Sequence, residues 1–237
     1  GRVISEIYNE YQSRLAANNA LDFDDLIWIP VKLFQQNESI LGYWHTQFQH
    51  ILVDEYQDTN RIQYDLIRLL ATNGETNKSE WNWKLRLPSG YAPRSLFVVG
   101  DADQSIYSFR LADFTILLDF QKDFGDGLAD EDTRTMIKLE ENYRSRENIL
   151  QAANHLIAHN SQRIDKVLKP TRGVGEQIFL YKADEEQEEA RFVVQQMQQI
   201  KQNNPEIDWG DFAILYRTNA QSRPFEDLLL HNNIPYN

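Results

Sequence analysis

The sequence predicts an α/β protein built on a doubly wound parallel sheet. Apolar runs of three to five residues alternate along the chain with segments whose apolar residues recur every three or four positions. Runs that are apolar at consecutive positions are typical of parallel strands buried on both faces, and the second spacing is typical of amphipathic helices. With 41% hydrophobic and 25% charged residues, the composition is ordinary for a globular protein of this class.

The elements follow in order along the chain. Residues 4–17 predict a first helix. Residues 22–34 predict a second, which Asp22 caps and Pro30 breaks or kinks. Later segments predict helices at 63–71, 114–120, 145–158, 185–202 and 224–231, and strands at 51–53, 96–99, 136–139, 178–181 and 212–216.

One irregular stretch, residues 73–94, interrupts this alternation and is longer than most connections inside compact domains. It predicts a surface excursion in which Trp81 and Trp83 pack locally or meet a partner, and local packing is the simpler expectation. A domain boundary is expected near residues 143–145, where a strand ends and a polar turn begins.

Composition also restricts the function. The 24 basic and 36 acidic residues give a formal net charge of −12, which is mild evidence against a nucleic-acid partner unless specific motifs outweigh it. The absence of cysteine excludes disulfides and thiolate metal sites. No stretch approaches the ~20 apolar residues of a membrane span, so we expect a cytoplasmic protein with no membrane partner.

The first polar strand end is the pair Asp54-Glu55, directly after the apolar run 51–53. Ligands of open α/β sheets bind outside the carboxyl ends of strands. Asp54 there suits Mg²⁺, and Glu55 can accept a proton from an attacking water, a division of labour that suits phosphoryl transfer. An isolated pair is better explained as the acidic first turn of a helix, but the longer string Asp54 to Thr59 favours a site.

The second strand end is the string from Gly100 to Arg110. Gln104 is a neutral donor that can sense a terminal phosphate. Tyr107 and Phe109 precede Arg110, and aromatic rings beside an arginine suit base stacking, although both rings can equally belong to the core.

The third strand end, after residues 136–139, presents Tyr143 and Arg144. The planar fork of donors on Arg144 matches the oxygens of a phosphate. Three polar strand ends in succession indicate a site that is built from several loops at one edge of the sheet.

Taken together, five strings resemble the Rep/UvrD/PcrA-type superfamily 1 DNA helicases and occur in the family's order. The resemblance spans nearly the whole chain apart from residues 73–94. The strings are Leu21-Asp22-Phe23-Asp24-Asp25-Leu26, Val53-Asp54-Glu55-Tyr56-Gln57-Asp58-Thr59-Asn60, Gly100 to Arg110, Glu141-Asn142-Tyr143-Arg144-Ser145, and Leu215-Tyr216-Arg217-Thr218-Asn219-Ala220-Gln221-Ser222-Arg223.

The resemblance implies an ATP hydrolase that uses ATP and Mg²⁺. Asp54 would hold Mg²⁺ and Glu55 would activate the hydrolytic water. Gln104 would couple the γ-phosphate to the DNA site, Arg144 would act as an arginine finger, and Tyr143 would stack near the adenine.

The resemblance also implies translocation from 3′ to 5′ on single-stranded DNA in repair or replication, with 3′-tailed duplex DNA and repair or replication proteins as partners. Single-stranded DNA would contact Tyr107, Arg110 and Phe109, which stands where the family often has tryptophan. Arg217 and Asn219 would contact the DNA backbone.

The sequence departs from the family in two places. The phosphate-binding loop G-x-x-x-x-G-K-[ST] is absent from these 237 residues, because Thr72 and Asn77 stand where Lys78-Ser79 would require glycines. Leu111 stands where the third motif usually has glycine, so a different backbone is expected there.

The resemblance divides the chain into parts of two RecA-like (P-loop NTPase) domains. Residues 1–20 would end an inserted helical subdomain, residues 21–144 would form the rear of the first domain, and residues 145–237 the front of the second. Without the phosphate-binding loop, the chain alone is expected to be inactive.

Three alternatives remain. The chain can serve as a non-catalytic DNA- or protein-binding platform, or it can belong to the helicase subunit of an AddA/RecB-type helicase-nuclease. A metal-dependent nuclease acting through Asp54, Asp101 and Asp103 is the least favoured, because the helicase motifs explain those acids.

Overall fold

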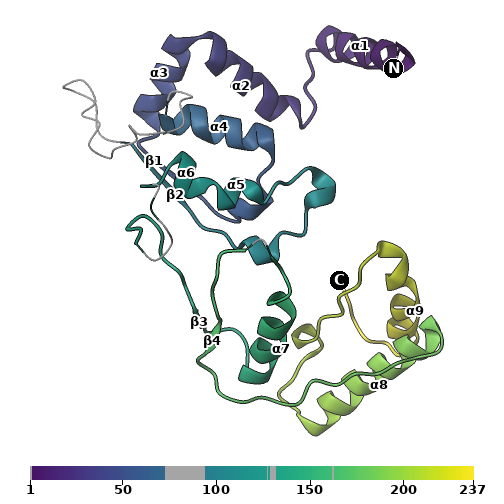
Figure 1. Ribbon diagram of the computed structural model, residues 1–237. Helices are drawn as coiled ribbons and strands as arrows, with labels where there is room; N and C mark the ends of the chain where they lie inside the picture. Colours follow the sequence, from purple (N-terminus) through teal and green to yellow (C-terminus); the bar gives the residue numbers. More distant parts are fainter. Residues whose placement is uncertain (1, 73–93, 127, 129–131, 162) are drawn as a thin grey trace. The chain divides into compact units, whose positions relative to one another are not determined.

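The computed structural model describes residues 2–72, 94–126, 128, 132–161 and 163–237 (Figure 1). The chain forms two compact units, Gly1–Gly175 and Glu176–Asn237. Of the irregular stretch 73–94, everything except Arg94 lies outside the described residues, including Trp81, Trp83 and Lys78-Ser79. Within the described ranges, no helix combines the length and the apolar character that a membrane span requires.

The first unit begins with helices α1 (Arg2–Ala17), α2 (Asp25–Gln36) and α3 (Glu38–Gln47). Asp22 Oδ1 accepts the N–H of Asp25, the first residue of α2, at 2.8 Å, although the residue directly before the helix is Asp24, whose side chain makes no cap. Of the break or kink predicted at Pro30, the break is wrong, because α2 continues through it. Burial of Val31 and Phe34 beyond the proline offsets the hydrogen bond that proline removes.

Helix α3 was not predicted, because its apolar residues show little helical spacing. In the structure, Leu41 is its only buried residue. Its start is defined instead by Asn37, whose Oδ1 accepts the N–H of Ile40 at 3.1 Å. Helix α4 (Arg61–Thr72) packs against α2 and α3 through a core that includes Phe34, Leu41 and Leu69.

Strands β1 (His50–Val53) and β2 (Ser95–Val98) pair in parallel, with Ile51 opposite Leu96 and Val53 opposite Val98. Both strands were predicted from their apolar runs. Because the pairing is parallel, the two carboxyl ends meet at the same edge of the sheet.

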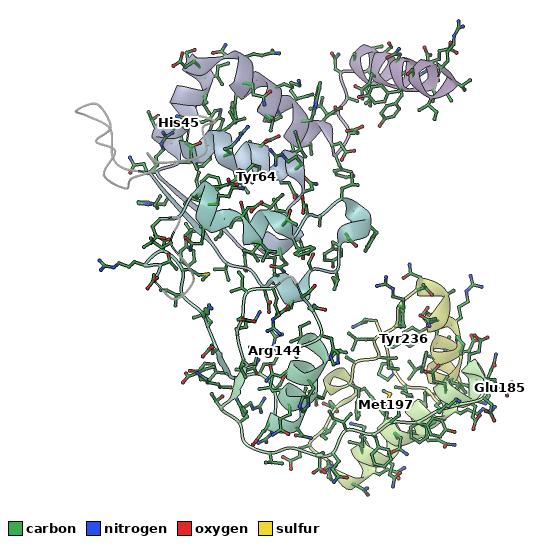
Figure 2. All side chains as sticks on the ribbon, viewed as in Figure 1. His45, Tyr64, Arg144, Glu185, Met197 and Tyr236 are labelled. Carbon is green, nitrogen blue, oxygen red and sulfur yellow. The ribbon has the colours of Figure 1, made fainter. Side chains whose placement is uncertain are left out.

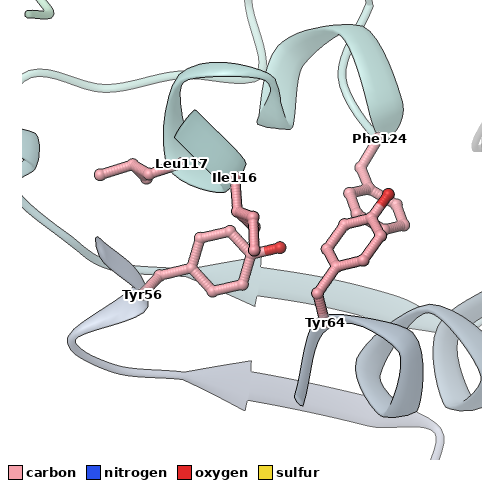
Figure 3. Packing of buried hydrophobic residues seen from close by; sticks show 5 residues of the cluster. All are labelled: Tyr56, Tyr64, Ile116, Leu117 and Phe124. Atoms are coloured by element: carbon pink, nitrogen blue, oxygen red, sulfur yellow. The ribbon is translucent and has the colours of Figure 1, made fainter. Parts of the chain in front are cut away.

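A second core covers this strand pair. Tyr56 and Tyr64 face Ile116 and Leu117 of α5 (Thr115–Leu118) and Phe124, which follows α6 (Phe120–Asp123) (Figure 3). Tyr56 is completely buried, and its ring meets the edge of Phe120 at a centroid distance of 5.7 Å. This packing anchors the turn that follows β1.

The first unit ends with β3 (Glu141–Asn142), α7 (Glu147–Ile157) and β4 (Lys169–Pro170), with β3 and β4 parallel. The strand predicted at 136–139 is wrong, since these residues pair with no strand in the part of the chain that the structure describes, and β3 begins at Glu141.

The second unit pairs α8 (Glu186–Asn203) with α9 (Arg223–His231), around a core that includes Met197 and Leu229. The strands predicted at 178–181 and 212–216 are wrong, because neither run pairs with a strand within the described ranges. Their side chains are largely exposed, as Leu180 (93%) and Leu215 (91%) show. The protein is thus a mixed α/β chain, and its continuous doubly wound sheet stays a prediction.

Candidate active site at the carboxyl ends of β1 and β2

The chain turns sharply where β1 ends. Glu55 adopts a left-handed backbone, with φ 49° and ψ 44°. Asp54 Oδ1 accepts the N–H of Glu55 at 2.9 Å, and the Glu55 carbonyl accepts the N–H of Asp58 at 3.0 Å. Residues other than glycine rarely adopt this conformation, and those that do cluster at functional sites. The turn presents the side chains of Asp54 and Glu55 to solvent and not to the hydrophobic interior.

A buried amide links the two strand ends. Gln57, in the short 3-10 helix Tyr56–Asp58, is 1% exposed. Its Nε2 donates to Glu55 Oε2 at 2.8 Å, and its Oε1 accepts the N–H of Asp101, just beyond β2, at 2.9 Å. The Gln57 side chain therefore connects the first polar strand end directly to the second.

Gly100 makes this link possible. A Cβ on Gly100 would lie 2.8 Å from Gln57 Oε1 and 3.2 Å from the backbone nitrogens of Gln57 and Tyr56. Such contacts are closer than van der Waals packing allows, so the amide of Gln57 reaches the loop after β2 because residue 100 has no side chain.

Asp101 is the centre of the loop after β2. Its Oδ2 accepts a hydrogen bond from Gln104 Nε2 at 2.8 Å, and its Oδ1 accepts one from Lys166 Nζ. Burial raises the pKa of Asp101, but the hydrogen bonds from Lys166 and Gln104 outweigh burial, so its pKa lies below the ordinary value. Asp101 is therefore ionised at neutral pH and orients the Gln104 amide.

A second carboxylate of this loop is also paired. Asp103 Oδ2 lies 3.3 Å from a terminal nitrogen of Arg163 and 3.5 Å from Lys166 Nζ. The Asp103 and Arg163 side chains are only 8% and 12% exposed, so this ion pair is well shielded from solvent. Both cations come from the segment between α7 and β4, which these contacts attach to the loop after β2.

Asp54 fits the requirements of a magnesium ligand. Its carboxylate is exposed, and its Oδ1 accepts the N–H of Glu55. Mg²⁺ is usually held by one or two carboxylates together with water and substrate phosphates, so a single exposed aspartate can supply one of its ligands. No group of three or more histidine or acidic side chains suited to a metal occurs within the described ranges.

Tyr143 and Arg144 lie at the third strand end, between β3 and α7 (Figure 2). The backbone of Arg144 is fixed, since its N–H donates to Asn142 Oδ1 at 3.0 Å and its carbonyl accepts from Arg172 at 2.7 Å. Its side chain is exposed, and among the described residues it makes no contact with Glu55 or Gln104. A hydrogen bond to Glu141 raises the pKa of Tyr143.

An exposed aromatic cluster follows Gln104. The rings of Tyr107 and Phe109 lie 5.9 Å apart, and the Arg110 guanidinium lies 5.1 Å and 5.5 Å from their centroids. Phe109 is 70% exposed, so the alternative that both rings belong to the core is wrong for Phe109. The cluster offers flat faces and a positive charge, as base stacking requires.

The remaining two predicted site residues, Arg217 and Asn219, belong to the second unit and are exposed. Gln221 Oε1 accepts the N–H of Arg217 at 2.9 Å, and Ser222 Oγ donates to the Asn219 carbonyl at 2.8 Å. These bonds shape the turn around the 3-10 helix Asn219–Ser222.

Three residues that hold this site together, Gln57, Arg163 and Lys166, were not predicted from the motifs, and Asp101 was named only as an acid of the nuclease alternative. The signal for Gln57 was its position two residues after Glu55, inside the same string. Arg163 and Lys166 carried no signal, because their acidic partners lie about 60 positions earlier in the sequence.

Comparison with known proteins shows the family to which the chain is similar. A family model described as the UvrD/REP helicase N-terminal domain matches residues 1–125, and one described as the UvrD-like helicase C-terminal domain matches residues 137–237. The ATP-dependent DNA helicase UvrD1 of Mycobacterium tuberculosis is 45% identical over 99% of this chain. The ATP-dependent DNA helicases PcrA of Staphylococcus aureus and Leuconostoc citreum are 41% and 40% identical over 99% and 98% of it.

The chain spans 28% of the length of each of these relatives. Both family models match in the expected order, and together they cover most of the sequence. The chain belongs to the UvrD/REP helicase family, whose helicase domains are RecA-like.

Proposed function

We propose that this chain is the central part of an ATP-dependent DNA helicase that couples ATP hydrolysis to 3′–5′ movement on single-stranded DNA. The observation that carries the proposal is the hydrogen-bonded path from Glu55 through Gln57 and Asp101 to Gln104. It joins a carboxylate suited to activate water with an amide suited to sense a phosphate, at the sheet edge where ligands bind. The relatives named as ATP-dependent DNA helicases support the same activity.

Hydrolysis would use the two carboxylates differently. Mg²⁺ held by Asp54 would neutralise charge on the phosphates of ATP. Glu55 Oε2 is engaged by Gln57, which leaves Oε1 to accept a proton from the attacking water. This arrangement holds the general base in one orientation before the substrate binds.

Gln104 and Arg144 would act on the terminal phosphate. One hydrogen of Gln104 Nε2 is used by Asp101, and the second remains for a phosphate oxygen. The exposed guanidinium of Arg144 supplies a bidentate donor for the same group, and Tyr143 supplies a ring for the adenine. Closure of the nucleotide site would bring Arg144 to the phosphate, as the proposed motor requires.

Single-stranded DNA would bind the cluster of Tyr107, Phe109 and Arg110. This cluster begins three residues after Gln104, so a short segment joins the phosphate-sensing amide to the base-stacking rings. Arg217 and Asn219 would add backbone contacts from the second unit. A 3′-tailed duplex is the substrate that such a translocase would unwind, in repair or replication.

Substitution of Glu55 by Gln in the full-length polypeptide tests the proposal. The variant keeps the size of the side chain but removes the base, so DNA-stimulated ATP hydrolysis should fall by about 100-fold or more, while ATP and oligo-dT binding persist. The matched control is Glu38→Gln, at the exposed first turn of α3, which should hydrolyse ATP normally. Undiminished turnover in Glu55→Gln would exclude this residue as the base.

A second function is favoured by one observation, the absence of the lysine loop from these residues. The chain would then be a DNA- or protein-binding platform that does not hydrolyse ATP. The same assay separates the two functions, since a full-length wild-type protein that binds oligo-dT without any ATP turnover would establish the platform. A helicase subunit of the AddA/RecB type would behave as the first proposal does, with a nuclease activity in addition.

A further inference from the structure

We propose that Gln57 is a positioning residue for Glu55, which it holds in the orientation needed to activate water, and that it ties this orientation to the loop carrying Gln104. The proposal rests on the proposed ATP hydrolysis. Gln57 would not touch the nucleotide, because its side chain is only 1% exposed. It would act entirely through the two hydrogen bonds of its amide group.

Both ends of that amide are committed. Nε2 donates to Glu55 Oε2 at 2.8 Å, and Oε1 accepts the N–H of Asp101 at 2.9 Å. An amide that bridges a carboxylate and a backbone N–H has a single orientation, since the reverse orientation would place oxygen against oxygen and nitrogen against nitrogen. Gln57 can therefore transmit a displacement of the loop after β2 directly to the Glu55 carboxylate.

The backbone supports this role. Glu55 is left-handed at φ 49°, a conformation that costs an ordinary residue free energy and persists only where neighbouring contacts enforce it. Gln57 Nε2 contacts the side chain of this strained residue, two positions along the chain. A purely structural glutamine would not need to bond to an exposed carboxylate, which water can solvate.

Gly100 supports the role independently. The absence of a side chain at residue 100 lets Gln57 Oε1 approach the loop after β2, where any Cβ would lie 2.8 Å from that oxygen. An alanine at residue 100 would displace the amide of Gln57 without adding a charge and without substituting Glu55 itself. It therefore offers a second way to break the same link.

Substitution of Gln57 by Glu in the full-length polypeptide is the decisive test. It keeps an oxygen for the N–H of Asp101 but replaces the donor to Glu55 by a second carboxyl group. The new carboxyl group presents an oxygen to the Glu55 carboxylate in place of the amide donor, so Glu55 loses its fixed orientation. The kcat for DNA-stimulated ATP hydrolysis should therefore fall by about 10-fold, whereas the KM for ATP should stay unchanged.

The matched control is Gln63→Glu. Gln63 Oε1 accepts the N–H of Asn60 at 2.9 Å, so this control adds the same charge and keeps an acceptor, but it has no contact with Glu55. Its kcat and KM should match those of the wild type. A loss of folded protein would lower the amount of active enzyme, which circular dichroism measures, so a kcat expressed per folded protein separates positioning from stability.

A readout without ATP completes the test. In Gln57→Glu the amide hydrogen of Asp101 should keep its wild-type protection from solvent exchange, because its acceptor remains, while Gln57→Leu should lose it. Should Gln57→Glu fail to fold, as circular dichroism would show, Gly100→Ala takes its place, with kcat expected to fall about 10-fold at unchanged KM for ATP.

The outcomes are distinct. A wild-type kcat in folded Gln57→Glu, or in Gly100→Ala where that variant takes its place, would overturn the positioning role and leave the proposed function intact. A full-length wild-type protein without any DNA-stimulated turnover would overturn the proposed function, and the positioning role with it.

Discussion

At the scale of single residues, the residues with a left-handed backbone fall into two groups: those whose side chain tolerates this conformation and those that are strained by it. Among the described residues, Asn19 and Asn233 have positive φ, which asparagine tolerates. Glu55 and Leu111 have positive φ without that tolerance, at 49° and 63°. Glu55 lies in one of the helicase strings at the end of β1, and Leu111 directly follows another, after the aromatic cluster. Each of these two strained residues lies in a loop whose turn requires this backbone conformation.

Leu111 adopts a backbone conformation that glycine adopts more readily than leucine. With φ 63° and ψ 18°, it occupies the region that favours glycine, and its side chain is 81% exposed. Leu111→Gly should therefore raise the free energy of unfolding, by about 1 kcal/mol, because strain is relieved and little packing is lost. Urea denaturation measures this change. In the control Leu52→Gly, at an exposed position of β1, the free energy of unfolding should instead decrease. A decrease in both variants would show that the backbone of Leu111 is not strained.

At the scale of elements, helices and strands differ in how far they depend on neighbouring segments for their backbone hydrogen bonds. Helices satisfy their own backbone, so all seven predicted helical segments contain helices, although the segment 114–120 became the short helices α5 and α6. A strand is stable only when its backbone hydrogen-bonds to a neighbouring strand. Of the five predicted strands, only those at 51–53 and 96–99 pair with another strand within the described ranges. The contact between the helices α3 and α4 also includes a titratable side chain.

His45 on α3 couples the α3–α4 pair to pH. Burial lowers the pKa of His45 below its ordinary value of 6.5, the positive charge of Arg94 lowers it further, and the Leu69 carbonyl, 2.9 Å from Nε2, only partly opposes this. Below about pH 6.5 the unfolded chain therefore binds more protons than the folded one, so stability falls as the pH decreases from 7 to 5.

The substitution His45→Gln keeps a donor for the Leu69 carbonyl and removes the titration. The decrease in urea midpoint between pH 7 and pH 5 should be smaller in this variant than in the wild type. The control His155→Gln, at an exposed position of α7, should show the wild-type decrease. An equal pH dependence in His45→Gln would mean that other groups dominate this range.

At the scale of the whole molecule, the proposed DNA binding and the proposed ATP hydrolysis depend on different parts of the chain. The exposed cluster of Tyr107, Phe109 and Arg110 is contained in one loop, whereas the proposed nucleotide site would need a phosphate-binding loop, which is absent from the 237 residues. The net charge of −12 opposes DNA over long distances, but stacking acts at contact and is far less sensitive to net charge.

The isolated 237-residue chain should therefore bind oligo-dT at low ionic strength and show no DNA-stimulated ATP hydrolysis. Fluorescence anisotropy of labelled oligo-dT and a phosphate-release assay measure the two activities. Joint substitution of Tyr107 and Phe109 by Ala should weaken binding by about 10-fold or more. The matched pair Tyr43→Ala and Phe48→Ala, two exposed aromatics of the helix α3 region, should not. Turnover by the isolated chain would contradict the need for the absent loop.

The sequence by itself determined the family, the α/β class, and which side chains follow the ends of β1 and β2. It could do so because motif strings and apolar runs are local properties, legible over ten residues. The order of Asp54, Glu55 and Gln104 along the chain predicted a site for phosphoryl transfer, and this remains a prediction.

Only the tertiary structure decided what holds those residues together. Gln57 meets Asp101 across 44 positions, and Lys166 meets Asp101 across 65, so neither contact could be read from spacing. The left-handed turn at Glu55 and the close approach at Gly100 depend likewise on the pairing of β1 with β2. Hydrogen bonds between distant segments form where the folded backbone brings donor and acceptor within about 3 Å, and that geometry exists only after the chain has folded.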